Sequence, residues 1–212
     1  MIDASIEYKS IIMRCDRIDK SAYLELPSGV EVVFYKAGME MVWAKVQKAA
    51  GEFAEDSVSD AAACFMERYG DRQQELSERC VFLKEQETGR YIGTCMAWFE
   101  QKNGDGVPVL HWLAVDDAYA GKGYARMLIT QVMKLFECFA KGQKIYLHTQ
   151  PCSYRAIKLY NDFGFFITKT DTYGTAVNEY EEAMPLLKRH MTAETYEKLL
   201  RTEGGHGCGG LC

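Results

Sequence analysis

The sequence predicts an α+β (α/β) fold in which strands and helices alternate along the chain. Short apolar runs with strand character recur between residues 11 and 149, and segments with helical spacing lie between them. A tight glycine turn, Gly121-Lys122-Gly123, joins one strand directly to an amphipathic helix that reaches Phe136. The chain has 212 residues, of which 48% are hydrophobic and 26% charged, so it is long enough for one well-packed domain with an extension.

The first half of the chain alternates strands and helices. Apolar residues recur every three to four positions in the predicted helices, and the last two strands flank the turn Glu87-Thr88-Gly89-Arg90, as in a hairpin. The predicted elements are a strand at 11–15, a turn at 26–29, a strand at 30–35, helices at 39–50 and 60–69, and strands at 80–84 and 91–99.

The second half repeats strand, helix, strand and helix. A polar turn at 103–106 leads into a strand at 109–115, which is followed by the glycine turn and its helix. A buried strand at 145–149 precedes a helix that begins near Ser153 and stops at Gly164. The segment 191–201 again has helical periodicity. No internal repeat is apparent.

The glycine turn is a candidate anion site. Glycines bring bare N–H groups up to a ligand, and the first helical turn has unpaired donors and a partial positive charge. A phosphate or pyrophosphate is the natural occupant. A turn of this kind also connects strands to helices where no ligand binds. The spacing excludes a P-loop, because Gly123 and Tyr124 follow Lys122, and it lacks the third glycine of a dinucleotide fingerprint.

This region closely resembles the acetyl-CoA site of the GNAT superfamily of N-acetyltransferases. The triplet Leu113-Ala114-Val115 ends the strand, and the segment 120–125 has the family's pattern of glycines after it. Ala120 departs from the pattern, because the family usually has Arg or Gln there. Phosphate binding would then depend on backbone amides, Lys122 and Arg126.

A second motif lies downstream at the expected distance. The segment 153–165 is similar to the family signature Asn-x-x-Ala-x-x-Leu-Tyr-x-x-x-Gly-Phe, with Ser153 in place of Asn and Tyr160 at the conserved Tyr. Serine is an equally good helix cap. The resemblance covers residues 28–185, and we expect an N-terminal extension at 1–27 and a C-terminal helix with a Gly/Cys-rich tail at 186–212. It implies a mixed, mostly antiparallel central sheet of six to seven strands with helices on both faces.

The resemblance implies acetyl-CoA as cosubstrate and a set of residues that bind it. The pantetheine arm would pair with the backbone at the end of the strand before the turn, where one N–H would face the thioester carbonyl. The implied cofactor-binding residues are Leu113, Ala114, Val115, Gly121, Lys122, Gly123, Tyr124, Ala125, Arg126 and Ser153.

Acyl transfer to an amine needs a base and an acid. Tyr160 matches the family's usual acid, which protonates the departing thiolate, although a tyrosine on an amphipathic helix can also merely pack. His111 is the first choice for the base, because it titrates near neutrality and matches a histidine of the serotonin N-acetyltransferase branch. Strand alternation predicts that His111, Leu113 and Val115 share one face. Glu100, Glu52 and a water chain are alternative bases.

The acceptor is less determined. Glu52, Phe53, Trp98 and Glu100 come from elements that line the acceptor groove of this fold, and their acidic and aromatic character suits a cationic amine. A half-buried hydrophobic surface would have the same composition. The acceptor could be a small amine, an amino acid or peptide, or a protein amine. A non-catalytic acyl-CoA-binding or interaction module is the alternative function, and a nucleotide enzyme of the doubly wound class is a weaker one.

Composition restricts the remaining classes. The net charge of −5 and dispersed basic residues argue against nucleic-acid binding. The chain starts without a signal-like segment and contains no apolar run long enough to span a bilayer, so we expect a cytoplasmic protein. The eight cysteines form no close-paired framework, and most are expected to be reduced and buried. The tail, with His206, Cys208 and Cys212, is expected to be flexible and to bind no metal. Segments outside the core are compatible with a homodimer.

Overall fold

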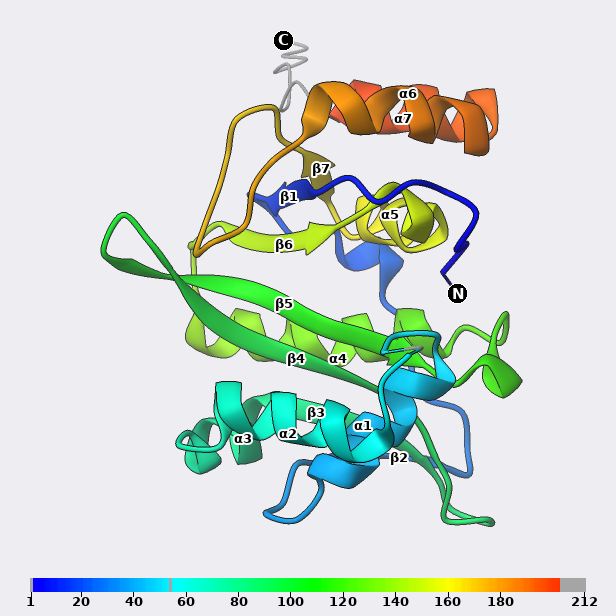
Figure 1. Cartoon of the computed structure of the whole chain (residues 1–212), viewed down its shortest axis with the longest axis vertical. Coiled ribbons are helices and arrows are strands. Elements are labelled where there is room, and N and C mark those ends of the chain that lie inside the picture. Colours follow the sequence, from blue (N-terminus) through cyan, green and yellow to red (C-terminus); the bar gives the residue numbers. More distant parts are fainter. Residues whose placement is uncertain (1, 54, 203–212) are drawn as a thin grey trace, which may run out of the picture. The chain divides into compact units, whose positions relative to one another are not determined.

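The computed structural model describes residues 2–53 and 55–202. These residues form two compact units, which are described separately (Figure 1). The first contains Ile2, Ala22–Phe99 and Pro108–Lys141, and the second contains Asp3–Ser21, Glu100–Val107 and residues 142–202.

The predicted fold class is confirmed. The described residues contain seven strands of a mixed, mostly antiparallel sheet and seven α-helices. Every strand pair whose register is known is antiparallel.

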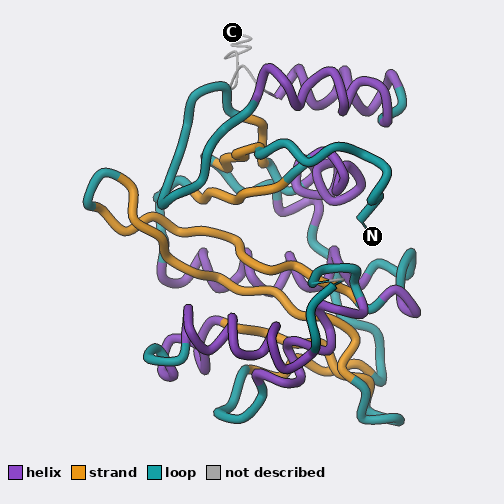
Figure 2. The backbone as a smooth tube through the Cα atoms, viewed as in Figure 1, coloured by secondary structure: helices purple, strands orange, loops and turns teal. Residues whose placement is uncertain are grey.

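The first unit is built around four strands and four helices. The strands follow the order β2 (Val30–Phe34), β3 (Cys80–Glu85), β4 (Tyr91–Lys102) and β5 (Asp105–Val115). The helices are α1 (Glu40–Ala49), α2 (Val58–Tyr69), α3 (Gln73–Arg79) and α4 (Tyr124–Phe139). A short 3-10 helix, Asp117–Tyr119, lies between β5 and α4, and the path through it can be followed in Figure 2.

Helices cover both faces of these four strands. Phe82, Met96 and Trp98 on one face belong to a buried cluster with residues of α1 and α2. On the other face, a Cβ built on Gly93 would come within 2.8 Å of Leu128 Cδ1, which places α4 there. The side chains of β3 and β4 alternate between the two faces of the sheet, so these strands separate two hydrophobic cores.

The second unit has three strands and three helices. β1 (Ile11–Cys15) lies between β6 (Ile145–Thr149) and β7 (Phe165–Ile167) and is antiparallel to both. The helices are α5 (Tyr154–Asp162), α6 (Tyr180–His190) and α7 (Ala193–Thr202). Residues 1–27, which we expected to form an N-terminal extension, therefore contribute β1, the middle strand of this unit. The predicted domain boundaries at residues 27 and 186 stay predictions.

Most predicted elements have the expected type, and their ends shift by a few residues. α3 and α6 have no counterpart among the predicted elements. The Gly/Cys-rich tail from residue 204 lies outside the described residues. All six described cysteines are free, and four of them are buried: Cys15, Cys80, Cys95 and Cys152. None of the helices within 2–53 and 55–202 has the length and apolar character needed to cross a membrane.

Candidate active site

The glycine turn has the backbone geometry of an anion cradle. Gly121 and Gly123 have φ angles of +77° and +86°, in the left-handed region that costs glycine little. Gly123 is the N-cap of α4, and a Cβ built on it would lie 3.2 Å from the Leu24 side chain. A Cβ on Gly121 would meet nothing within 4 Å. The turn therefore leaves open space beside the start of the helix.

The charges around this turn favour an anion. α4 is 16 residues long and has no acidic residue in its first turn, so its partial positive charge is not offset there. Lys122 lies with its Nζ 5.2 Å from the centre of the Tyr119 ring. Arg126 donates from Nη1 to the carbonyl of Ala22 at 3.1 Å. Lys122 and Arg126 thus both have partners in the described fold.

The strand before the turn, β5, is continuous but has a distorted backbone at Trp112. Its φ angle is +53°, which is unusual for a bulky residue and marks a local break in the pleat. The carbonyl of Trp112 accepts a hydrogen bond from Gln47 Nε2 at 3.1 Å. Beyond the break, Ala114 packs against α1, and the Val115 side chain lies toward Gly93 on the α4 face.

One prediction about this strand is wrong. We expected His111 to share a face with Leu113 and Val115, opposite Trp112. His111 Nδ1 and Trp112 Nε1 instead both contact the hydroxyl of Tyr69, at 3.1 and 2.8 Å. Strict alternation would separate two adjacent side chains, and the left-handed residue Trp112 removes that alternation.

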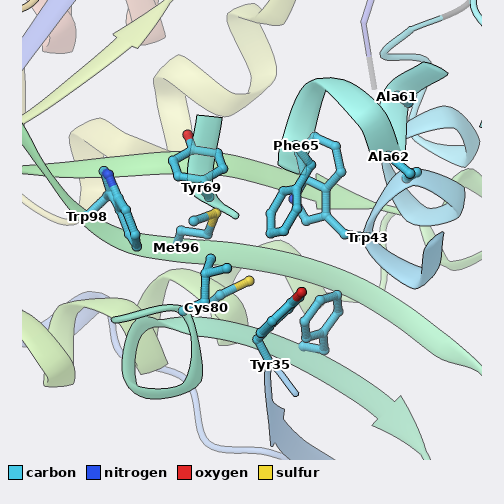
Figure 3. Close-up of a cluster of buried hydrophobic side chains, with 12 residues drawn as sticks. Tyr35, Trp43, Ala61, Ala62, Phe65, Tyr69, Cys80, Met96 and Trp98 are labelled. Carbon is cyan, nitrogen blue, oxygen red and sulfur yellow. The ribbon is translucent and has the colours of Figure 1, made fainter. Parts of the chain in front are cut away.

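The predicted acceptor residues are divided between the two units. Phe53 stacks on Trp112 with ring centres 5.7 Å apart, and Trp98 meets Tyr69 edge-to-face at 4.9 Å. Burial raises the pKa of the Glu52 carboxyl. Glu52, Phe53 and Trp98 belong to the first unit, and Glu100 belongs to the second. Figure 3 shows Trp98 and Tyr69 within the aromatic cluster.

Two buried polar atoms of α1 have no hydrogen-bond partner in the described part of the chain. They are Trp43 Nε1 and Gln47 Oε1, on side chains with 0% exposure. An unsatisfied buried polar group destabilises a fold by about 1–3 kcal/mol, so such atoms suggest a use beyond packing. Sequence reasoning missed Gln47 and Tyr69. The only available signal was their place on the buried face of a helix.

The second motif lies in the second unit. Tyr160 is 7% exposed, and its ring meets Phe165 edge-to-face at 6.1 Å. Ser153 occupies the N-cap position of α5, but its side chain makes no capping hydrogen bond. Its hydroxyl instead accepts from Gln150 Nε2 at 3.2 Å, so the expectation of a serine cap is wrong. The roles of Tyr160 and Ser153 toward acetyl-CoA stay predictions.

Comparison with known proteins identifies the family. The model of the acetyltransferase (GNAT) family matches residues 45–165, which is more than half of the chain. The chain therefore belongs to the GNAT acetyltransferase family. Among curated proteins, none matches the chain.

Solved structures support the same fold. A GCN5-related N-acetyltransferase from Sphaerobacter thermophilus has a TM-score of 0.56 and 16% identity, with 78% of this chain and 50% of the other covered. A tandem GNAT protein from the clavulanic acid biosynthesis pathway has a TM-score of 0.55 and 12% identity, with 77% and 51% covered. A GNAT-family acetyltransferase from Colwellia psychrerythraea has a TM-score of 0.54 and 13% identity, with 78% and 55% covered. The chain spans about half the length of these proteins.

Proposed function

We propose that this protein is an N-acetyltransferase that moves an acetyl group from acetyl-CoA to a primary amine by direct attack in a ternary complex. Family membership supports acetyl transfer in general. The observation that carries the proposal is the pair of left-handed glycines, Gly121 and Gly123, at the start of a 16-residue helix that follows strand β5 and a short 3-10 helix. Such a turn suits the pyrophosphate of CoA.

The residues around the turn receive roles from their chemistry. The amides of residues 121–126 and the ammonium of Lys122 would hold the pyrophosphate. The backbone of Leu113, Ala114 and Val115 would pair with the pantetheine amides, and an N–H of this triplet would stabilise the oxyanion. His111 would take a proton from the incoming ammonium. Tyr160 would protonate the departing thiolate.

The acceptor is proposed to be a cationic primary amine, either a small molecule or an amine of a peptide or protein. Phe53 and Trp112, which are partly buried, supply aromatic surface that can attract a cation through the ring faces, and the buried Trp98 belongs to the same cluster. Glu52, the sequence neighbour of Phe53, would add a carboxylate. Burial raises the pKa of Glu52 and so favours its neutral form. The ammonium group of an acceptor would act in the opposite direction and favour the charged form.

Calorimetry of acetyl-CoA, CoA and ATP binding tests the cofactor. Gly121→Glu would place a carboxylate in the open space of the turn, so the variant should lose acetyl-CoA binding. Gly142→Glu is the matched control, because Gly142 has a φ angle of +73° and equally open surroundings but follows the other end of α4. If both variants bind like the wild type, or the wild type does not bind, the proposal fails.

Turnover is tested separately with a panel of primary amines. We expect thiol release that depends on the amine, and a loss of rate in Tyr160→Phe with acetyl-CoA affinity unchanged. Binding of acetyl-CoA without release for any amine would favour the non-catalytic module. Two observations support that alternative, because each removes a polar group that could hold acetyl-CoA. Ala120 has no polar side chain, and the Ser153 hydroxyl already accepts a hydrogen bond from Gln150.

A further inference from the structure

Gln47 is a polar residue on the hydrophobic face of α1. Its side chain has 0% exposure, and the other buried residues of this helix are Trp43, Ala44 and Val46. Its Nε2 donates to the carbonyl of Trp112 at 3.1 Å, whereas its Oε1 has no hydrogen-bond partner among the residues that the structure describes. An apolar side chain of the same length would avoid the cost of that buried oxygen. What the amide contributes is therefore its donated N–H.

The orientation of the amide follows from its partner. A backbone carbonyl can only accept, so the Gln47 atom that faces it must carry a hydrogen. Exchanging the two ends of the amide would place Oε1 against the Trp112 oxygen, where two acceptors would meet. The contact thus assigns Nε2 to the carbonyl and leaves Oε1 on the unpartnered side.

The carbonyl that Gln47 holds belongs to a residue in an unfavourable conformation. Trp112 has a φ angle of +53°, which persists in a bulky residue where the surroundings hold it. Its indole N–H donates to the Tyr69 hydroxyl at 2.8 Å, and its ring stacks on Phe53. These two contacts hold the side chain, and the hydrogen bond from Gln47 holds the backbone.

The same hydrogen bond determines where the next N–H points. The carbonyl of Trp112 and the N–H of Leu113 belong to one planar peptide unit. No described peptide bond is cis, so this N–H points to the side opposite Gln47. Asp116 N donates to the carbonyl of Ile92 in β4 at 2.9 Å. Because successive N–H groups of a strand point to alternate edges, counting back from Asp116 directs the N–H of Leu113 away from β4.

We propose that Gln47 is a positioning residue, which holds the Trp112 carbonyl and thereby aims the Leu113 N–H at the carbonyl oxygen of the bound acetyl thioester. This inference rests on the proposed function, in which an N–H of residues 113–115 stabilises the oxyanion. As the amine forms its C–N bond, the carbonyl π pair moves onto oxygen, where the negative charge meets this N–H. The C=O bond then forms again, the C–S bond breaks, and sulfur leaves with the electron pair.

Two variants separate the donated N–H from the shape of the side chain. Gln47→Met has a similar length but cannot donate, whereas the carboxyl of Gln47→Glu only accepts when ionised and donates when protonated. Gln73→Met is the matched control. Gln73 Nε2 also donates to a carbonyl at 3.1 Å, and its Oε1 is also buried without a partner among these residues. Its acceptor, however, is Gly70 at the end of α2 and not β5.

Backbone NMR of the full chain without ligand tests the hydrogen bond independently of turnover. In the wild type we expect Trp112 shifts that indicate a positive φ angle. This pattern should be lost in Gln47→Met and kept in Gln73→Met, and thermal unfolding would show that both variants remain folded. A positive φ angle that persists at Trp112 in Gln47→Met would overturn the inference.

Steady-state rates test the consequence for catalysis. Losing one oxyanion donor lowers kcat about 100-fold or more, so misdirecting one in Gln47→Met should lower kcat at least about tenfold. The affinity for acetyl-CoA should change little, because the glycine turn would hold the pyrophosphate independently. Gln73→Met should keep the wild-type kcat.

The pH dependence of Gln47→Glu supplies a readout that a purely structural role would not move. Its kcat relative to the wild type should recover as the pH falls, because the protonated carboxyl can donate and burial raises its pKa. The ratio removes titrations that both proteins share. Equal rates of the Glu and Met variants at every pH from about 5.5 to 8.5 would overturn the inference. An inactive wild type would contradict the proposed function, and the Trp112 shifts would still decide whether Gln47 holds this backbone.

Discussion

The two faces of the sheet in the first unit are packed in different ways. On the α4 face, Leu128 approaches Gly93, and Val132 and Met133 on the same helix are fully buried aliphatic and thioether side chains. On the face covered by α1 and α2, the core is aromatic and contains phenol and indole groups (Figure 3). The buried amide of Gln47 on α1 donates to the carbonyl of Trp112. The side chains named on the first face are apolar and contribute to stability. The second also holds polar atoms that a purely structural core would avoid.

The two buried polar atoms of α1 that have no hydrogen-bond partner add to this difference between the faces. Trp43 Nε1 and Gln47 Oε1 both lie on the aromatic side, within one turn of each other on α1. Trp112, which contacts this side, has a left-handed backbone conformation. Unfavourable conformations of this kind persist where the surrounding structure holds them and often accompany function. The comparison therefore predicts that substitutions on the α4 face change stability and that substitutions on the aromatic face change activity.

Gly93→Ala should have the largest effect on stability. A Cβ at this position would lie 2.6 Å from the carbonyl oxygen of Ala114 and 2.8 Å from Leu128 Cδ1, so backbone would have to move. We expect a loss of about 2–4 kcal/mol in the free energy of unfolding, measured by urea denaturation. Gly104→Ala is the comparison, because its surroundings are open and its cost comes only from the left-handed backbone at φ +89°, without a clash. A loss no greater than that of the control would contradict the tight packing of this face.

His111→Gln should show the opposite behaviour on the aromatic face. Removing a general base lowers kcat about 100-fold, and the half-buried side chain leaves most of the packing intact. Steady-state rates with the best amine of the panel, together with a urea titration, separate the two effects. A variant that loses stability but keeps its rate would show that His111 is not the general base. It would also contradict the expectation that substitutions on the aromatic face mainly change activity.

Periodicity was enough to predict most of the fold. The strands at 11–15 and 145–149 have the predicted bounds, because short apolar runs between turns have few other ways to be buried. α3 was missed because it is short and polar, with only Leu76 buried, and α6 was missed because it contains Pro185. In both cases the local signal is weak and tertiary packing decides the structure.

The site was only partly predictable, for a different reason. The turn at Gly121 and Gly123 is encoded locally, since glycine tolerates a positive φ angle. A positive φ angle at a tryptophan is not encoded locally, so nothing predicted the break at Trp112. Without that break, the contact of His111 with Tyr69 cannot be inferred, because the two residues are 42 positions apart in the sequence.

Trp43→Phe tests whether the unpartnered indole weakens the aromatic core. The substitution loses buried volume but also removes an unsatisfied N–H, so the two effects should nearly cancel and the free energy of unfolding should change by less than about 1 kcal/mol. Trp98→Phe is the control, because Trp98 lies in the same cluster and its indole nitrogen is not among these unpartnered buried atoms. A larger loss in Trp43→Phe than in the control would contradict this view.

Glu52→Gln should have the smallest effect, and its sign is informative. Burial raises the folded-state pKa of Glu52 above its ordinary value of 4.5. Above pH 4.5 the folded state therefore binds more protons than the unfolded state, so this group lowers stability as the pH rises through its folded pKa. The glutamine variant should be slightly more stable than the wild type at pH 7 and equal to it below pH 4. Thermal unfolding across this range measures the difference.

The same variant should also raise the KM for the amine, if Glu52 contacts the acceptor. A gain in stability together with a loss of acceptor affinity is the behaviour expected of a residue kept for function at a cost in stability. A variant with higher stability and an unchanged KM would mean that the carboxylate is not part of the acceptor site. The aromatic face would then bind the amine through its rings alone, and Phe53→Leu, which removes the ring stacked on Trp112, would become the deciding substitution.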